Sequence, residues 1–422
     1  MIRHRLPRRN KPVGGNSSVW IPSQRVEYTY YFAVAYSLWA GALGVEVPLV
    51  AAGLTIALAG YCMSNQGSRA KEINRPTAFL IACIISFILI QTVIHGMPLT
   101  ADIIRHFIVW GAGLIVVQSL CLRPRFLHRF VVVLFVLGLV AVPFLTFSGG
   151  PLEVSRARID VQVSGNLTHQ NGLASWFGFC AIFFAIFGLE SNRSVLRAIS
   201  WLLAAGCWLI IGYTVSRGTL LATAIATSFG FRRILGRGFA PLILLLLIVA
   251  LAAESGLFED IVSRYADRST EETGRLLLWP YVIERFLMSP LLGVGVINNS
   301  TYVPELNQSI STPHNSFLFF ALSSGVVPLA LYVTYWIRAA RRYFSRSKRH
   351  EYAPYQIPFL LYVLVIFMLG DVNMASWVLL ALTVGAGAGA SYHGREAILA
   401  RSNEQHRTKA LLTRNTTAAN LR

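Results

Sequence analysis

Charged residues are scarce in this sequence, and their scarcity excludes an ordinary water-soluble protein. Only 13% of the 422 residues are charged, whereas 55% are hydrophobic. Average soluble domains carry about 25% charged residues. A chain this apolar cannot hide its hydrophobic surface in one soluble core, so we expect it to reside in a membrane.

Paired cysteines and the short motifs of common catalysts are also missing. The five cysteines fall inside or at the ends of apolar runs and none forms a CxxC pair, which argues against a disulfide framework and a zinc site. No DxD pair, Walker loop, HExxH or GxSxG motif occurs. Nothing therefore indicates a metal-bound nucleotide-sugar donor, and we expect neither a metal nor another cofactor.

Long apolar runs are what the sequence has in abundance. They are about 20 residues long, enough for each to cross a bilayer as an α-helix. They predict an all-α, polytopic integral membrane protein with about twelve spans. The predicted spans are 29–44, 47–64, 77–95, 103–121, 129–147, 171–189, 197–215, 217–231, 239–253, 315–337, 356–370 and 374–391. The first two could instead form a single broken hairpin.

The net charge of +18 follows membrane topology rather than a nucleic-acid surface, and no nucleic-acid partner is expected. With the N-terminus in the cytoplasm, 29 of the 37 Lys and Arg residues fall in cytoplasmic segments, as the positive-inside rule requires. Both termini are then cytoplasmic, and the basic segments meet anionic lipid headgroups. The external exceptions are Arg105, Arg156, Arg158, Arg217, Arg264, Arg268, Arg275 and Arg285.

The spans and loops divide the chain into four predicted parts. They are residues 1–253 with spans one to nine, an external segment at 254–313, the last three spans at 314–391, and a basic cytoplasmic tail at 392–422. Within the external segment, Thr273–Met288 mixes apolar residues with Arg275, Glu284 and Arg285. That mixture predicts an amphipathic helix in the membrane interface.

Three external side chains could carry chemistry, and each also has a simpler structural explanation. Arg217 lies between two apolar runs with almost no loop, where it either binds an anion or ends a helix by snorkelling to the boundary. Arg275 begins the amphipathic helix, where it either joins the helix N-terminus in binding an anion or pairs with Glu271 or Glu272. His314 lies where the external segment re-enters the membrane, and it either exchanges a proton near neutral pH or caps a helix.

Two sets of polar neighbours complete the candidate site. The segment 165–172 (GNLTHQNG) precedes a predicted span, and its His169 and Asn171 could bind sugar hydroxyls or simply form a polar loop with an N-cap. Asn315, next to His314, could orient either the imidazole ring or a sugar.

Four short elements resemble the motifs of one known family. The first is Ser216-Arg217-Gly218, similar to its SRG element, and the second is Gly274-Arg275 with Trp279 and 289–295 (SPLLGVG), similar to R…W…F…P-L-x-G-x-G. The third is 313–318 (PHNSFL) with Gly325, similar to H-N-x-x-L…G, and the fourth is 165–171, similar to G…T…H-x-N. Together they resemble the superfamily of O-antigen ligases and O-antigen polymerases, bacterial envelope glycosyltransferases. The resemblance is strongest over residues 160–330.

The resemblance implies a GT-C-like fold in the bacterial inner membrane with a periplasmic active site. The implied donor is a glycan on undecaprenyl diphosphate, moved to a sugar hydroxyl without a metal. The acceptor is the lipid A core in the ligase branch, another lipid-linked repeat unit in the polymerase branch, and a protein in a third branch. We favour the ligase because there is one long external loop and a compact twelve-span plan. Arg217 and Arg275 would then bind the diphosphate, and His314 would be the base of an inverting transfer.

A transporter or flippase of lipid-linked sugars is the alternative from another class. Such proteins place polar or ionisable groups near the bilayer midplane, often on broken helices or inverted repeats. Functional residues at the external boundary favour the transferase, whereas a polar pathway through the membrane would favour transport.

Overall fold

The computed structural model is predominantly helical. Helices form because the apolar runs hold few Gly, Pro or charged residues in their interiors, and because a helix satisfies its own backbone hydrogen bonds. The parts of the chain that the structure describes are residues 20–39, 48–65, 75–99, 102–141, 145–147, 159–161, 170–214, 216–235, 275–344 and 352–370, with the single positions 380 and 383.

The helices follow the apolar runs closely. Their bounds are α1 (Gln24–Trp39), α2 (Pro48–Asn65), α4 (Arg75–Leu89), α5 (Asp102–Leu120), α6 (Phe126–Ala141), α7 (Gln170–Glu190), α8 (Ser194–Tyr213), α9 (Arg217–Leu235), α12 (Arg275–Met288), α13 (Ser316–Ser324), α14 (Val326–Phe344) and α15 (Ala353–Leu369). A π-helical turn, η1 (Ile90–Ile94), continues α4. Two short ladders pair β1 (Leu145–Phe147) with β2 (Ile159–Val161) and β3 (Thr301–Val303) with β4 (Gln308–Ile310).

Several described helices have the character of membrane spans. Three are long and apolar enough to cross a bilayer: Pro76–Ile94, Asn171–Glu190 and Ser194–Tyr213. Four shorter apolar helices lie at Val50–Asn65, His106–Leu120, Phe126–Val140 and Ala353–Leu369. The protein is therefore a helical membrane protein. The total of twelve spans stays a prediction, since 239–253 and most of 374–391 fall outside the described residues.

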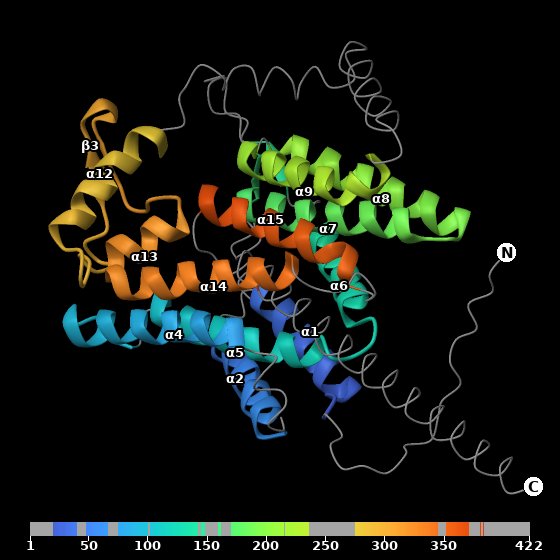
Figure 1. Ribbon diagram of the computed structural model, residues 1–422, viewed down its shortest axis with the longest axis horizontal. Helices are drawn as coiled ribbons and strands as arrows, with labels where there is room; N and C mark the ends of the chain where they lie inside the picture. Colours follow the sequence, from blue (N-terminus) through green and yellow to red (C-terminus); the bar gives the residue numbers. More distant parts are fainter. Residues whose placement is uncertain are drawn as a thin grey trace, which may run out of the picture.

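Helix α7 is the centre of one half of the bundle. It packs against α6, α8, α9 and α15. In its most apolar stretch 89% of the residues are buried, compared with 22% in the corresponding stretch of α8. In the other half, α4 lies alongside α14, and α2 alongside α5 (Figure 1). The helix α12 and the β3–β4 hairpin form a separate lobe beside α13 (Figure 1).

Two predicted spans were wrong in detail. The helix expected over 129–147 ends at Ala141, and 145–147 instead forms β1, which runs antiparallel to β2 with Thr146 opposite Asp160. Pro143 explains the early end because the residue before a proline disfavours the α conformation. The two small ladders also mean that the all-α prediction holds for the bundle but not for every segment.

The span expected over 315–337 is broken into α13 and α14 at Gly325, where φ is 79°. A Cβ atom there would lie 2.2 Å from the carbonyl oxygen of Leu291, so only glycine fits. The break lets the amide of Val326 donate to the carbonyl oxygen of Pro290 at 2.8 Å. Helix α14 then extends past the predicted end, to Phe344.

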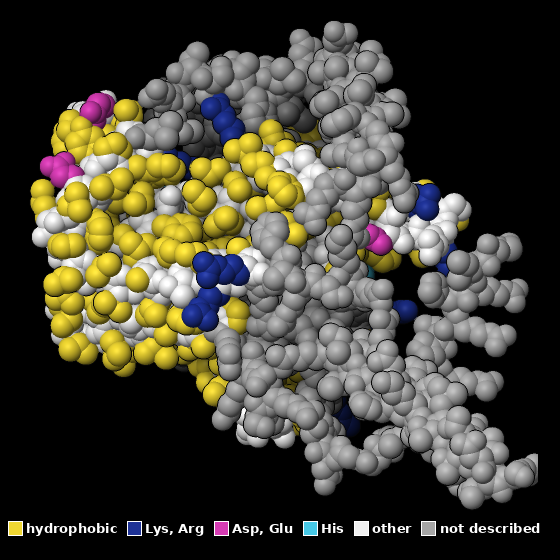
Figure 2. All heavy atoms as spheres, viewed as in Figure 1, with side chains coloured by type: hydrophobic (Ala, Val, Ile, Leu, Met, Phe, Trp, Pro, Cys, Tyr) yellow, Lys and Arg dark blue, Asp and Glu magenta, His cyan; other side chains and the backbone are white. Residues whose placement is uncertain are grey.

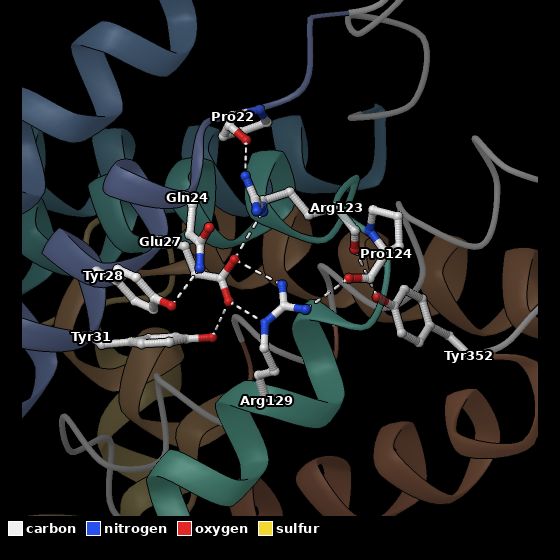
Figure 3. A network of polar contacts seen from close by, with 9 residues as sticks. All are labelled: Pro22, Gln24, Glu27, Tyr28, Tyr31, Arg123, Pro124, Arg129 and Tyr352. Carbon is white, nitrogen blue, oxygen red and sulfur yellow. Dashed lines mark hydrogen bonds and ion pairs between the residues drawn. The ribbon is translucent and has the colours of Figure 1, made fainter. Parts of the chain in front are cut away.

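A buried carboxylate joins α1 to the turn between α5 and α6 (Figure 3). Glu27 is fully buried. Arg129 donates two hydrogen bonds to its carboxylate, from Nε at 2.6 Å to one oxygen and from Nη2 at 2.8 Å to the other. Arg123 Nε lies 2.9 Å from the same carboxylate, and Tyr31 donates its hydroxyl to it at 2.5 Å. Arg123 and Arg129 are among the 29 basic residues that the sequence assigns to cytoplasmic segments. Their role in packing depends on Glu27, which that assignment did not single out.

Candidate functional site

Arg217 stands at the N-terminus of α9, as the sequence predicted for the start of a span. Its side chain is half-buried. The turn before it is ordered by Ser216, whose carbonyl oxygen accepts from the amide of Leu220 at 2.9 Å and whose hydroxyl donates to Thr219 at 3.1 Å. The first-turn amides of a helix carry a partial positive charge, so this position suits an anion.

Arg275 begins α12 and reaches the same place from another part of the chain. Its Nη1 donates to the carbonyl oxygen of Leu369, the last residue of α15, at 2.5 Å. The same Nη1 lies 4.0 Å from the position that a Cβ atom would occupy on Gly218. Gly218 directly follows Arg217, so the structure brings the guanidinium of Arg275 to the first turn of α9.

Trp279 connects this arginine-bearing helix to the segment that holds His314. Arg275 and Trp279 are four residues apart and therefore share one face of α12. The Nε1 atom of Trp279 donates to the carbonyl oxygen of Pro313 at 3.0 Å. His314 is the next residue along the chain, so it lies at the same end of the bundle as the two arginines. Trp279 was noted in the sequence as a motif residue, but nothing there indicated this bond.

His314 has an unusual backbone for a non-glycine residue. Its φ is 47°, in the left-handed region, and its side chain is half-buried rather than sealed in the packed helices. The hydroxyl oxygen of Thr312 lies 3.5 Å from its Nδ1. Strained backbone of this kind persists only where its surroundings hold it, and it gathers at functional sites.

Asn315, rather than His314, caps the following helix. It is the N-cap of α13, and its Oδ1 accepts from the amides of Phe317 at 2.9 Å and Leu318 at 3.2 Å. The side chain is only 8% exposed. Any contact of Asn315 with a sugar would therefore involve its NH₂ group, because the carbonyl oxygen serves the helix.

The polar segment before α7 is only partly within the described residues. His169 lies outside them, whereas Asn171 is half-buried in the first turn of α7. Ser175 donates to the carbonyl oxygen of Asn171 at 2.7 Å, and its hydroxyl lies 3.5 Å from that of Thr219 on α9. Asn171 thus stands close to the turn that carries Arg217.

Helices α7 and α9 run parallel, so their N-termini open at the same end. Residues later in α7 contact residues later in α9. Ser175 lies beside Thr219, a Cβ atom built on Gly178 would contact Thr223, and a Cβ atom built on Gly230 would contact Ile186. Two helix dipoles therefore direct their positive ends toward the region of Arg217 and Arg275. The electrostatic character of this end of the bundle favours a bound anion.

A row of buried hydroxyl groups follows α9 inward from this end. It consists of Ser216, Thr219, Thr223 and Thr227, joined from α15 by Tyr362, whose hydroxyl donates to the carbonyl oxygen of Ser175 at 2.5 Å. Sequence reasoning missed this row, although the spacing of three and four residues was visible. The buried polar side chains described in α7, α9 and α15 are Ser, Thr, Gln and Tyr, and none carries a charge. Such hydroxyls serve chiefly to pack helices closely in a membrane.

The glycine-rich segment 289–296 supports the site from the other side. The amides of Val294 and Gly295 donate to the carbonyl oxygens of Leu322 and Ser323 at the end of α13, at 2.8 and 3.1 Å. Gly293 has φ 70°, and a Cβ atom on it would lie 2.5 Å from the carbonyl oxygen of Leu322. Only glycine permits this approach.

Gln91 fastens the same segment to the π-helical turn η1. It is fully buried, donates to the carbonyl oxygen of Ser323 at 2.8 Å, and accepts from the amide of Val296 at 2.9 Å. In the turn between β3 and β4, the carboxylate of Glu305 accepts a hydrogen bond from the hydroxyl of Tyr281 at 2.6 Å, and this bond lowers the pKa of Glu305. These bonds hold α12, α13 and the hairpin as one lobe.

Taken together, the fold and this site define a helical membrane protein with two arginines, a histidine and two helix N-termini at one end of its bundle. Among the described residues, no group of three or more His, Cys, Asp or Glu side chains could hold a metal ion.

Comparisons with known proteins agree with this description. Residues 198–333 match the family model described as O-antigen ligase. A protein of Rickettsia felis with the provisional name of a polysaccharide ligase is 24% identical over 183 residues, with 36% of this chain and 45% of that protein covered. The chain thus spans less than half the length of this curated relative. Both findings are similarities to O-antigen and polysaccharide ligases over a part of the chain, and the region matched by the family model contains Arg217, Arg275 and His314.

Proposed function

We propose that this protein is an O-antigen ligase of the bacterial inner membrane. It transfers a glycan from undecaprenyl diphosphate to a sugar hydroxyl of the lipid A core at the periplasmic face. The observation that supports the proposal is the position of Arg275 Nη1, 4.0 Å from a Cβ atom built on Gly218, the residue that follows Arg217.

The arginines would stabilise the leaving group. As the bond between the anomeric carbon and the diphosphate oxygen breaks, the electron pair stays with the diphosphate and its negative charge grows. Arg217, Arg275 and the N-terminal amides of α9 would stabilise that charge in the transition state. Arg275 is already oriented by its hydrogen bond to Leu369, so little reorganisation is needed at the moment of reaction.

His314 would accept the proton of the attacking hydroxyl. The acceptor oxygen forms a bond to the anomeric carbon while its proton passes to the imidazole, and direct attack inverts the anomeric centre. The proposal is supported by the bond between Trp279 and Pro313, which ties the histidine segment to the helix bearing Arg275. His169, Asn171 and Asn315 would contact sugar hydroxyls around these groups.

One reconstitution separates the branches of the family. Purified protein in vesicles is incubated with lipid-linked glycan and either lipid A core or a second lipid-linked unit, with and without EDTA. We expect glycan on the lipid A core in both the presence and the absence of EDTA. Lengthened lipid-linked chains would instead indicate an O-antigen polymerase, and transfer only to added protein would indicate an O-oligosaccharyltransferase. Complete loss with EDTA, restored by magnesium or manganese, would contradict metal independence.

A lipid-linked sugar transporter is the remaining alternative, and the buried hydroxyl row along α9 is the observation that could favour it. That row carries no charge, and its hydroxyls bond mainly to helix backbone and to one another. Arg217 and Arg275, the two cationic groups of the proposed site, are the first residues of α9 and α12 and do not lie at the middle of a helix. Movement of lipid-linked glycan between leaflets without covalent transfer would replace the transferase proposal.

A further inference from the structure

The last residues of α12 and the turn that follows it expose large apolar side chains to the surroundings. Four of them are more than half exposed: Leu287 at 66%, Met288 at 74%, Leu291 at 69% and Ile297 at 70%. Ile283 and Leu287 lie four residues apart on one face of α12, and Leu291 follows in the turn. A contiguous apolar patch of this kind marks a contact with a membrane or a partner.

Much of the backbone of the same turn is paired with protein. The amides of Gly293, Val294 and Gly295 donate to the carbonyl oxygens of Ser289, Leu322 and Ser323. The carbonyl oxygen of Leu292 accepts from His95 Nε2 at 3.1 Å, and that of Pro290 accepts from the amide of Val326 at 2.8 Å. A loop in water needs no such pairing, whereas irregular backbone at membrane depth must have it.

The charge distribution agrees with immersion of this turn. No Asp, Glu, Lys, Arg or His occurs from Phe286 to Pro304. Arg285 stands at the neck of the turn, where its guanidinium donates to the carbonyl oxygens of Asn298, at 2.8 Å, and Ser300. The first charged group is thus held where the apolar tip ends, as expected when charges avoid hydrocarbon.

The exposed tip is continuous with a membrane-spanning surface. It joins the end of the candidate span 76–94 through the bond between His95 and Leu292 and through Gln91. On that span, Leu89, Val93 and Ile94 are themselves 55%, 72% and 52% exposed. In Figure 2, hydrophobic side chains cover most of the side of the molecule that carries α4, α12 and α13.

We propose that residues 287–297 form a lipid-immersed tip that inserts into the bilayer leaflet reached by the end of α4. The sequence assigned residues 289–297 to the external segment that follows the interfacial helix Thr273–Met288, so the tip adds a membrane contact outside the predicted spans. It anchors the C-terminal end of α12 in hydrocarbon, while Arg275 at the opposite end bonds to α15. The tip is independent of the proposed transfer reaction and rests only on membrane residence.

Fluorescence quenching tests the depth of the tip. Leu291→Cys and, separately, Ile297→Cys are labelled with an environment-sensitive fluorophore, and each protein is reconstituted in phosphatidylcholine vesicles. Gln308→Cys on the exposed β4 strand is the control. The five native cysteines are buried, and the unsubstituted protein provides the labelling background.

We expect labels at 291 and 297 to emit at shorter wavelength and to be quenched by doxyl-labelled phospholipid, and the label at 308 to be quenched by aqueous iodide. Iodide quenching at 291 and 297 equal to that at 308 would place the tip in water and overturn the proposal. Blue-shifted emission quenched by neither agent would indicate a protein occupant, such as a second copy, and would overturn it equally.

Discussion

The indole Nε1 of Trp279 donates a 3.0 Å hydrogen bond to the carbonyl oxygen of Pro313, the residue before His314. This bond spans α12 and the start of α13. It therefore couples the helix that orients Arg275 to the residue proposed as the base.

Removing that donor should impair transfer without unfolding the protein. Trp279→Phe keeps an aromatic ring but loses the N–H, so we expect turnover to fall about 2- to 10-fold, the effect of one hydrogen bond worth about 0.5–1.5 kcal/mol. The donor KM and the melting temperature should change little. Trp201→Phe on the surface of α8 is the matched control. Equal turnover in both variants would show that the bond does not position His314.

Transfer should depend on both the charge and the planar shape of the guanidinium groups of Arg217 and Arg275. Arg217→Ala and Arg275→Ala should each lower turnover about 10²-fold, as when one transition-state donor is removed. Arg→Lys at each position should also be impaired, because lysine lacks the planar fork that binds phosphate in a bidentate manner. Arg341→Ala, on the exposed surface of α14, should retain activity. Full activity of Arg217→Lys would contradict bidentate binding of diphosphate by that residue.

The role of His314 is best tested with a residue that can adopt the same left-handed backbone conformation. Asparagine tolerates the left-handed conformation that His314 adopts at φ 47° and still forms hydrogen bonds, but it cannot take a proton near neutral pH. His314→Asn should therefore abolish transfer while lipid-linked donor still binds, and His314→Gln should also fail. Donor binding is measured with a fluorescent lipid diphosphate. Substantial turnover by His314→Asn would eliminate His314 as the general base.

The Glu27 cluster should matter for stability rather than for chemistry. Glu27→Gln would leave Arg123 and Arg129 facing each other without a counter-charge. Breaking a fully buried pair costs about 3–5 kcal/mol, and because both arginines reach solvent we expect about 1–3 kcal/mol here. The measurement is the unfolding temperature in detergent, with Glu284→Gln on the exposed side of α12 as the control. An unchanged unfolding temperature would mean that the cluster does not hold α1 in place.

Adding a methyl group should lower the stability of the protein at Gly293 but not at Gly206. Gly293→Ala would force a Cβ atom to 2.5 Å from the carbonyl oxygen of Leu322 at a left-handed φ, and we expect clear destabilisation of the lobe formed by α12 and α13. Gly206→Ala in α8 meets no atom within 4 Å and improves helix propensity, so it should be neutral or slightly stabilising. Protease susceptibility and unfolding temperature report both. Comparable stability of the two variants would contradict the packing described here.

The sequence by itself determined where the chain forms helices and which side chains stand at their ends. Each apolar run is a local property, and most described helices fall within a few residues of the predicted spans. The placing of Arg217 at a helix start and of Arg275 at the start of an amphipathic helix followed from the same local logic.

Only the tertiary structure decided which of these ends meet. Arg275 reaches Gly218 and Leu369 because packing brings the starts of α9 and α12 to the end of α15, and no local periodicity records that packing. The break at Gly325 depends on the backbone of Leu291 lying against it, and the burial of Glu27 depends on two arginines from another helix pair. Contacts between distant segments are set by side-chain interlocking and backbone pairing in the folded bundle, so the sequence could nominate the site residues but could not bring them together.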